Sequence, residues 1–284
     1  MSRDASMSIL QKVVVDGFLI AGLTISMFAC KLLWPPFQRG FFCNDETLMF
    51  PYHNDTVTVP MLRVVGLGVP LLAMLICEWA LLRREHDDTR VLGVRIPMWV
   101  RGLYCAATSF ALGVLFVELT TDIAKKTIGR PRPHFFEICR PSVDCSSPEW
   151  HSRYIQSSDY TCTGEHTERF QDIRVSFLSG HSSWSAFTMV FFALYLERRM
   201  TWRGTRVLRH TLQFTALMLS WFTALSRVSD FKHHWSDVLA GYFLGLSFAV
   251  IVWTWGTDLV QKKKHHSALS QHDVIVIGQV PDTA

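Results

Sequence analysis

Charge is scarce in this chain of 284 residues, because Asp, Glu, Lys and Arg together make up 18% of it and hydrophobic residues 49%. With 20 Phe and 10 Trp residues, the chain is also more aromatic than an average soluble domain. This composition argues against an ordinary soluble globular protein. The sequence shows no internal repeat either, so we expect a single domain at residues 13–257.

Long apolar runs account for the low charge. A bilayer core about 30 Å thick is crossed by roughly 20 mostly apolar helical residues. Runs of this length lie at residues 13–33, 61–82, 99–124, 177–196, 207–225 and 236–256. They predict an all-α fold, an integral membrane bundle of six transmembrane helices with both termini on one side.

A soluble helical protein with fully buried helices is the alternative, and ionisable residues inside the runs favour it. These residues are Asp16, Arg63, Glu78 and Arg101. Charged side chains near span ends can, however, face the interior of a bundle or extend to the interface. Six long runs separated by charged loops therefore favour the membrane protein.

The two ends of the chain carry different signals. The first run has no small-residue cleavage site and ends at Lys31, so we interpret it as a retained signal anchor behind a cytoplasmic N-terminus, residues 1–12. Residues 258–284 show no helical periodicity, and we expect a flexible cytoplasmic tail there.

Lys and Arg indicate the orientation. Residues 83–95 and 197–209 are rich in arginine, which predicts that these short loops are cytoplasmic. The outer loops are then residues 34–60, 125–176 and 226–235, and we expect the long one to form an extracellular cap. Asn54, in the first outer loop, begins a glycosylation triplet with Asp55 and Thr56.

The inner loops lack cysteine, whereas the outer loops contain four cysteines, which suits an oxidising exterior. These residues are Cys43, Cys139, Cys145 and Cys162. We expect two or more of them to form disulfides, and the sequence leaves three connectivities open if all four pair.

Three short polar segments lie at the outer ends of spans. They are KKTIGRPRPHF (residues 125–135), SGHSS (179–183) and SRVSDFKHHWSD (226–237). Taken singly, they read as topology signals, a helix cap and interfacial histidines. Taken together, they supply fixed cations, backbone N–H groups at a helix start and two imidazoles at the depth of a lipid phosphate. The combination predicts a phosphate site.

The spacing of these segments resembles the three signature motifs of the type-2 phosphatidic acid phosphatase superfamily. Lys125 with Arg132-Pro133 is similar to the first motif, Ser179-Gly180-His181 to the second, and Arg227 with His233 and Asp237 to the third. The similarity extends over most of residues 10–257 and is greatest to the six-span lipid phosphate phosphatases of animals.

This resemblance implies a phosphohistidine mechanism without metal or cofactor. His233 would attack phosphorus, and Asp237, one helical turn later, would accept a hydrogen bond from the other ring nitrogen and so orient the ring. His181 would protonate the leaving alkoxide and then activate water. The adjacent His234 also lies within reach of Asp237, so its role stays open.

The remaining motif residues would hold the phosphate oxygens. These residues are Lys125, Arg132, Ser179, Gly180 and Arg227. No two-metal carboxylate cluster is apparent in the three segments. Two further carboxylates, Glu118 and Asp122, are expected to pair with cations such as Arg101 or the motif lysines.

The leading hypothesis is a phosphatase acting on phosphatidate, lysophosphatidate, sphingosine 1-phosphate or ceramide 1-phosphate. Its rival is a non-catalytic lipid-phosphate binder or transporter, which should have polar or broken helices at mid-membrane. We expect membrane lipids and no nucleic acid as partners. The resemblance further implies a plasma-membrane location and self-association into a homo-oligomer.

Overall fold

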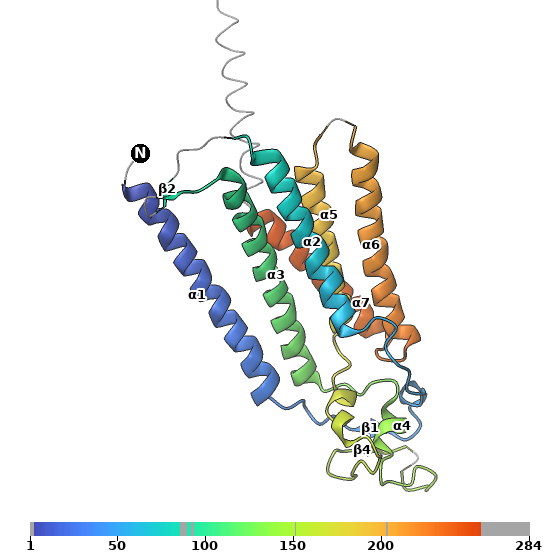
Figure 1. Ribbon diagram of the computed structural model, residues 1–284. Coiled ribbons are helices and arrows are strands. Elements are labelled where there is room, and N and C mark those ends of the chain that lie inside the picture. The colour runs from blue at the N-terminus through green and yellow to red at the C-terminus, as the bar shows by residue number, and fades with distance from the viewer. Residues whose placement is uncertain (1–2, 86–89, 92–93, 151, 203, 257–284) are drawn as a thin grey trace, which may run out of the picture.

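The structure, a computed structural model, describes residues 3–85, 90–91, 94–150, 152–202 and 204–256. Long helices lie side by side along the molecule (Figure 1). They are α1 (Arg3–Leu33), α2 (Val59–Leu82), α3 (Met98–Ile128), α5 (Gly180–Arg199), α6 (Arg206–Ser229) and α7 (Trp235–Gly256). The predicted all-α fold is confirmed. The expected tail at residues 258–284 lies outside the described residues.

Short elements occupy the connections. They are β1 (Phe41–Phe42), η1 (Glu46–Leu48), β2 (Arg90–Val91), β3 (Val94–Arg95), α4 (Phe135–Cys139), β4 (Tyr154–Ile155), η2 (Thr167–Arg169) and η3 (Asp172–Arg174). β1 pairs antiparallel with β4, which aligns Phe41 with Ile155. β2 pairs antiparallel with β3 at the opposite end of the bundle (Figure 1).

Among the described residues, four helices are long and apolar enough to cross a membrane: α1 from Ile9 onward, α2, α3 and α7. These helices fit a membrane protein. α5 and α6 coincide with the predicted runs 177–196 and 207–225 but do not reach the same apolarity. α5 packs against α2, α3, α6 and α7, and a helix surrounded by other helices can carry polar side chains away from lipid. Six spans therefore remain a prediction.

Aromatic side chains of α3 and α5 form the core of the bundle. Phe110 of α3 lies 5.9 Å from Phe187 and 5.4 Å from Phe191, measured between ring centroids. Between helices that lipid surrounds, such rings stabilise the bundle by close packing and not by leaving water. α7 approaches α5 closely at Gly245, where an added Cβ would lie 2.1 Å from the Ser183 carbonyl oxygen. Glycine at this position lets α7 lie directly against the start of α5.

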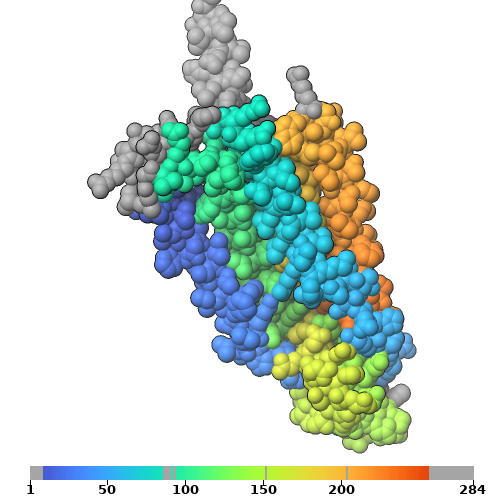
Figure 2. Space-filling view, in the orientation of Figure 1, coloured from blue at the N-terminus to red at the C-terminus, as the bar shows by residue number. Residues whose placement is uncertain are grey.

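The loops at residues 34–58, 129–150 and 152–179 gather at one end of the bundle, and we call them the loop cluster. Figure 2 shows them as a compact mass below the helices. The cluster has its own core, which includes the buried rings of Phe41, Phe135 and Tyr160. Disulfides join Cys43 to Cys145 and Cys139 to Cys162, one of the three connectivities that the sequence leaves open.

Candidate active site

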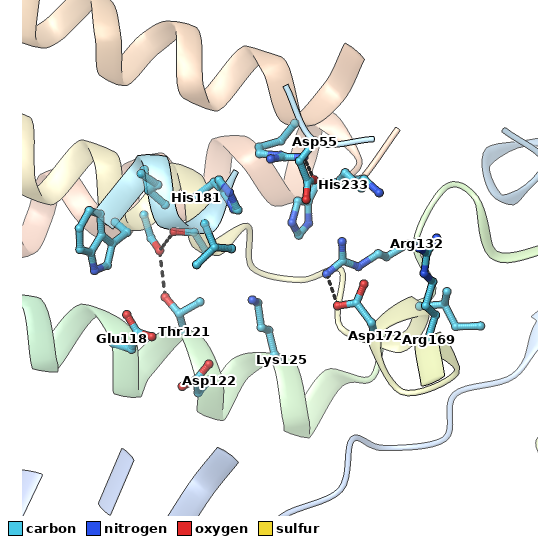
Figure 3. A pocket seen from close by; sticks show the side chains of 18 of the residues that line it. Asp55, Glu118, Thr121, Asp122, Lys125, Arg132, Arg169, Asp172, His181 and His233 are labelled. Atoms are coloured by element: carbon cyan, nitrogen blue, oxygen red, sulfur yellow. Dashed lines mark hydrogen bonds and ion pairs between the residues drawn. The ribbon is translucent and has the colours of Figure 1, made fainter. Parts of the chain in front are cut away.

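A cavity of about 440 Å³ lies where the loop cluster meets the ends of the helices. Six of the eight predicted site residues line it: Lys125, Arg132, Gly180, His181, Arg227 and His233. Figure 3 shows Lys125, Arg132, His181 and His233 around one common space. Ser179 and Asp237 are fully buried outside this lining, where the Ser179 N–H donates to the Asp237 carbonyl at 3.1 Å. The structure therefore brings all three sequence segments together.

The first segment is positioned by the turn that ends α3. Gly129 adopts a left-handed conformation with φ of 58°, and an added Cβ would lie 1.9 Å from the Phe37 carbonyl oxygen. Glycine fits this close approach without strain. The turn leaves Lys125 in the last turn of α3. This helix ends at Ile128, four residues beyond the end of the predicted run. It then directs Arg132 back to the cavity, where the Arg132 N–H donates to the Ile173 carbonyl at 2.8 Å.

His233 lies in the short connection between α6 and α7, and its side chain is buried. Its Nδ1 bonds to the Ser176 carbonyl oxygen at 2.6 Å. A carbonyl oxygen only accepts, so Nδ1 carries the proton and Nε2 keeps a lone pair. Burial, followed by the charges of Arg132, Lys125 and Arg227, lowers the pKa of His233 well below its ordinary value. The ring is therefore neutral at pH 7, with a nucleophilic nitrogen.

The expected hydrogen bond from His233 to Asp237 is wrong. His233 precedes α7, which begins at Trp235, so the two residues do not share a helix face. Asp237 instead accepts from the Ser176 hydroxyl at 2.6 Å and from Arg130 at 2.5 Å. It also accepts from the backbone N–H of His234 at 3.2 Å, as an acidic residue in the first turn of a helix often does.

Ser176 and Arg130 were therefore missed by the sequence analysis. Arg130 lies inside the first motif segment, between the two cations that the resemblance selected, so its charge was a usable signal. Ser176 lies three residues before Ser179, in a stretch without regular structure, and nothing in its sequence context distinguishes it. His234 bonds through Nε2 to the Pro131 carbonyl at 3.1 Å and does not line the cavity.

His181 and Arg227 share one backbone acceptor from the first outer loop. The Val57 carbonyl oxygen lies 3.1 Å from His181 Nε2 and 3.1 Å from Arg227 Nη1. Arg227 occupies the last turn of α6, and its Nη2 also donates to Asp55 at 2.6 Å and to Asp230 at 3.2 Å. Its Nε is buried and has no hydrogen-bond partner among the described residues. One guanidinium N–H is thus left unsatisfied by the described residues.

The other two cations differ in how they are paired. Arg132 Nη2 donates to Asp172 at 2.7 Å, and its buried Nε has no hydrogen-bond partner in the described part of the chain. The Lys125 ammonium has no hydrogen bond or ion pair within the described residues. It lies at the start of α5, because an added Cβ on Gly180 would be 3.1 Å from Lys125 Nζ. The cavity therefore presents donors suited to an anion with several oxygens.

Two cations contact the ring of Tyr52, another lining residue that the sequence analysis missed. The Lys232 ammonium lies 3.6 Å from the centre of the Tyr52 ring, and the Arg169 guanidinium lies 4.4 Å from it. His134 contacts the same ring edge-on at 5.2 Å. Burial lowers the pKa of His134 to about 4, with the charge of Arg132 acting in the same direction.

The deeper carboxylates pair with cations of the spans, as expected, although with Lys31 and Arg63 and not with Arg101. Glu118 lies 2.5 Å from Lys31 and 3.6 Å from Arg63, and Asp122 lies 3.4 Å from Lys31. These pairs connect α3 to α1 and α2. Within the described residues, no group of three His, Cys, Asp or Glu side chains is placed to hold a metal ion.

Comparison with known proteins gives this arrangement a family. Residues 106–261 match the PAP2 superfamily, which covers more than half of the chain. The chain belongs to the PAP2 superfamily. The resemblance drawn from the three motifs is confirmed, and the match includes every PAP2 motif residue named above.

Several PAP2 relatives extend the similarity to nearly the whole chain. A Drosophila melanogaster protein, provisionally named a phosphatidate phosphatase, is 40% identical over 92% of this chain and 72% of its own length. Phospholipid phosphatase 1 of Mus musculus is 37% identical over 90% of this chain and 87% of its own length. Phospholipid phosphatase 2 of Homo sapiens is 31% identical over 92% of this chain and 88% of its own length. No solved structure matches the chain significantly.

Proposed function

We propose that this protein is an integral-membrane phosphatase that hydrolyses lipid phosphate monoesters through a phosphohistidine intermediate. The observation that carries the proposal is the neutral His233, whose Nδ1 proton is committed to the Ser176 carbonyl while Nε2 is left as a nucleophile in a cationic cavity. The names of the phospholipid phosphatase relatives support the same reaction class.

The first step is an in-line displacement at phosphorus. His233 Nε2 forms a bond to phosphorus while the phosphorus–oxygen bond to the lipid breaks. His181 enters this step as an imidazolium whose Nε2 proton stays bonded to the Val57 carbonyl, and it transfers its Nδ1 proton to the departing alkoxide. In the second step His181 takes a proton from water, the water oxygen attacks phosphorus, and the phosphorus–nitrogen bond breaks. The products are the dephosphorylated lipid and inorganic phosphate.

The cations stabilise the charge on the equatorial oxygens in both steps. Lys125 offers an unpaired ammonium, and Arg132 and Arg227 each place a guanidinium on the cavity wall. Backbone N–H groups in the first turn of α5, which begins at Gly180, add to this field. Three cations supply the charge that a metal ion would otherwise provide, so we propose a reaction independent of metal.

The substrates that we propose are phosphatidate, lysophosphatidate, sphingosine 1-phosphate and ceramide 1-phosphate. The cavity lies at the ends of apolar helices, so a phosphate can reach the cations while the acyl chains stay in hydrocarbon. We further propose six spans, cytoplasmic termini, and an active site on the outer face of the plasma membrane. The arginine-rich inner loops and the cysteine-containing loop cluster support this orientation.

A phosphate-release assay tests the proposal. The full chain, purified in detergent micelles, should release phosphate from lysophosphatidate in excess chelator, and His233→Ala should abolish release while the protein stays folded. Tight lysophosphatidate binding without release would favour the rival, a non-catalytic binder. Loss of release in chelator that magnesium restores would refute metal independence.

A further inference from the structure

Asp55 is a carboxylate inside the phosphate cavity that neither the motifs nor the mechanism uses. It lines the cavity, and Figure 3 labels it among the side chains that surround this space. Its Oδ1 accepts from Arg227 Nη2 at 2.6 Å. A carboxylate at this distance occupies an N–H that a phosphate oxygen would otherwise take, and it repels a phosphate dianion.

Arg227 does not depend on Asp55 for charge compensation. Asp230 lies three residues after Arg227, is 5% exposed, and already accepts from Arg227 Nη2 at 3.2 Å. Asp230 is itself held by Thr56, whose N–H and hydroxyl donate to it at 2.8 and 2.6 Å. The Arg227–Asp230 pair is therefore a fixed part of the wall.

The Asp55 side chain, in contrast, is free to leave. It is 39% exposed, and its neighbours hold the backbone without it, because Thr56 is bonded to Asp230 and the Val57 carbonyl to His181 and Arg227. Burial by itself raises the pKa of Asp55, but the charge and hydrogen bond of Arg227 outweigh burial and lower it. The side chain is thus an anion at neutral pH that can turn out of the cavity while the loop stays in place.

We propose that Asp55 is an internal competitor of the phosphate group: its carboxylate binds Arg227 in the empty site, and the phosphate of substrate or product must displace it. The inference rests on the proposed function. Its consequence is a weakened hold on phosphate, which speeds release of the product from a site that is otherwise strongly cationic. Asp55 is then a residue that sets phosphate affinity, not a catalytic one.

The test is the affinity for inorganic phosphate of Asp55→Asn and Asp55→Ala. Asn keeps the shape of Asp and removes its charge, and Ala removes the side chain. Both variants of the full chain in micelles should bind inorganic phosphate at least tenfold more tightly, about 1.4 kcal/mol. Affinity is read as competitive inhibition of lysophosphatidate hydrolysis and as phosphate-dependent protection against thermal unfolding.

Glu165→Gln is the matched control, because Glu165 pairs with Arg140 at 3.3 Å in an exposed part of the loop cluster. Its phosphate affinity should equal that of the unmodified chain. Unchanged or weaker phosphate binding in both Asp55 variants would overturn the inference, since a residue that merely positions Arg227 would lower affinity when removed. Thermal protection needs no turnover, so this outcome is distinguishable from failure of the phosphatase proposal, in which the unmodified chain releases no phosphate.

Discussion

The carboxylate of Asp237 accepts a hydrogen bond from the Ser176 hydroxyl at 2.6 Å, and the carbonyl of the same serine accepts one from His233 Nδ1. The acidic residue of the third motif therefore reaches the nucleophile through a serine and not by direct contact. Arg130 bonds to the other carboxylate oxygen, which fixes the orientation of Asp237. The orientation of the His233 ring therefore depends on the backbone of residues 176–179 as much as on the segment 226–237 that contains His233.

Ser176→Ala tests this relationship. The substitution keeps the Ser176 carbonyl, which accepts the His233 proton, but removes the hydroxyl that donates to Asp237. The position of the carbonyl is then no longer fixed by that hydrogen bond. One hydrogen bond to a charged group is worth about 1.5–3 kcal/mol, and we expect kcat to fall roughly tenfold or more with little change in KM. Ser176→Thr, which keeps a hydroxyl, should retain more activity. A kcat of Ser176→Ala equal to that of the unmodified chain would show that the serine is not part of the orienting path.

The two adjacent histidines should behave differently. His233→Ala should lose several orders of magnitude in turnover because no covalent route remains. His234→Ala should keep measurable activity, because His234 bonds to the Pro131 carbonyl outside the cavity. Enzyme quenched with labelled substrate should carry a label that is lost in acid, survives base and maps to His233. A label on His234 would contradict the assignment.

The meeting of the three polar segments was predictable from the sequence, because helices that end at one membrane level bring their terminal residues together. The helix starts and ends agree with the predicted runs to within four residues, except that α1 begins at Arg3, ten residues before its run. α5 is not apolar enough to be recognised as a span because it lies inside the bundle, where serines such as Ser182 and Ser185 are buried among other helices.

What the sequence could not supply lies in the irregular loops. Asp55 meets Arg227 across 172 residues, and no periodicity encodes that contact. The helical spacing of His233 and Asp237 predicted a contact that the chain does not make, since α7 begins only after His233. The pairing of Cys43 with Cys145 likewise depends on how the loop cluster folds.

Gly180→Ala should perturb the phosphate site without perturbing the fold. The new methyl would lie 3.1 Å from Lys125 Nζ, the mobile end of a long side chain, so Lys125 must shift by a few tenths of an ångström. Small displacements of binding groups reduce rates, and we expect kcat/KM to fall by roughly tenfold. The control is Gly68→Ala in α2, where an added Cβ meets nothing within 4 Å. Its activity should be unchanged, and equal losses in both variants would show a general helix effect.

Stability should fall in mild acid through His134. Its pKa is about 4 in the folded chain against an ordinary value of 6.5, because the buried ring resists protonation. The unfolded chain therefore binds this proton first, and up to about 3 kcal/mol of stability is lost as the pH falls from 6.5 to 4. The melting temperature of His134→Gln in micelles should decline less steeply over this range. The exposed His166 provides the control, and a slope for His134→Gln equal to that of His166→Gln would contradict the prediction.

Glycosylation of Asn54 tests which side of the membrane the loop cluster faces. Asn54 is exposed and directly precedes the cavity-lining Asp55, whereas Thr56 of the same triplet is bonded to Asp230, so a glycan must be attached before this loop folds. If the loop cluster faces outward, Asn54→Gln should remove a glycosidase-sensitive mass shift, and Thr56→Ser, which preserves the triplet, should keep it. Intact cells should also dephosphorylate lysophosphatidate added outside, because the cationic cavity opens on the same face as Asn54. Hydrolysis that appears only after permeabilisation, together with an Asn54 that is never glycosylated, would invert the proposed orientation and place the site on the cytoplasmic side.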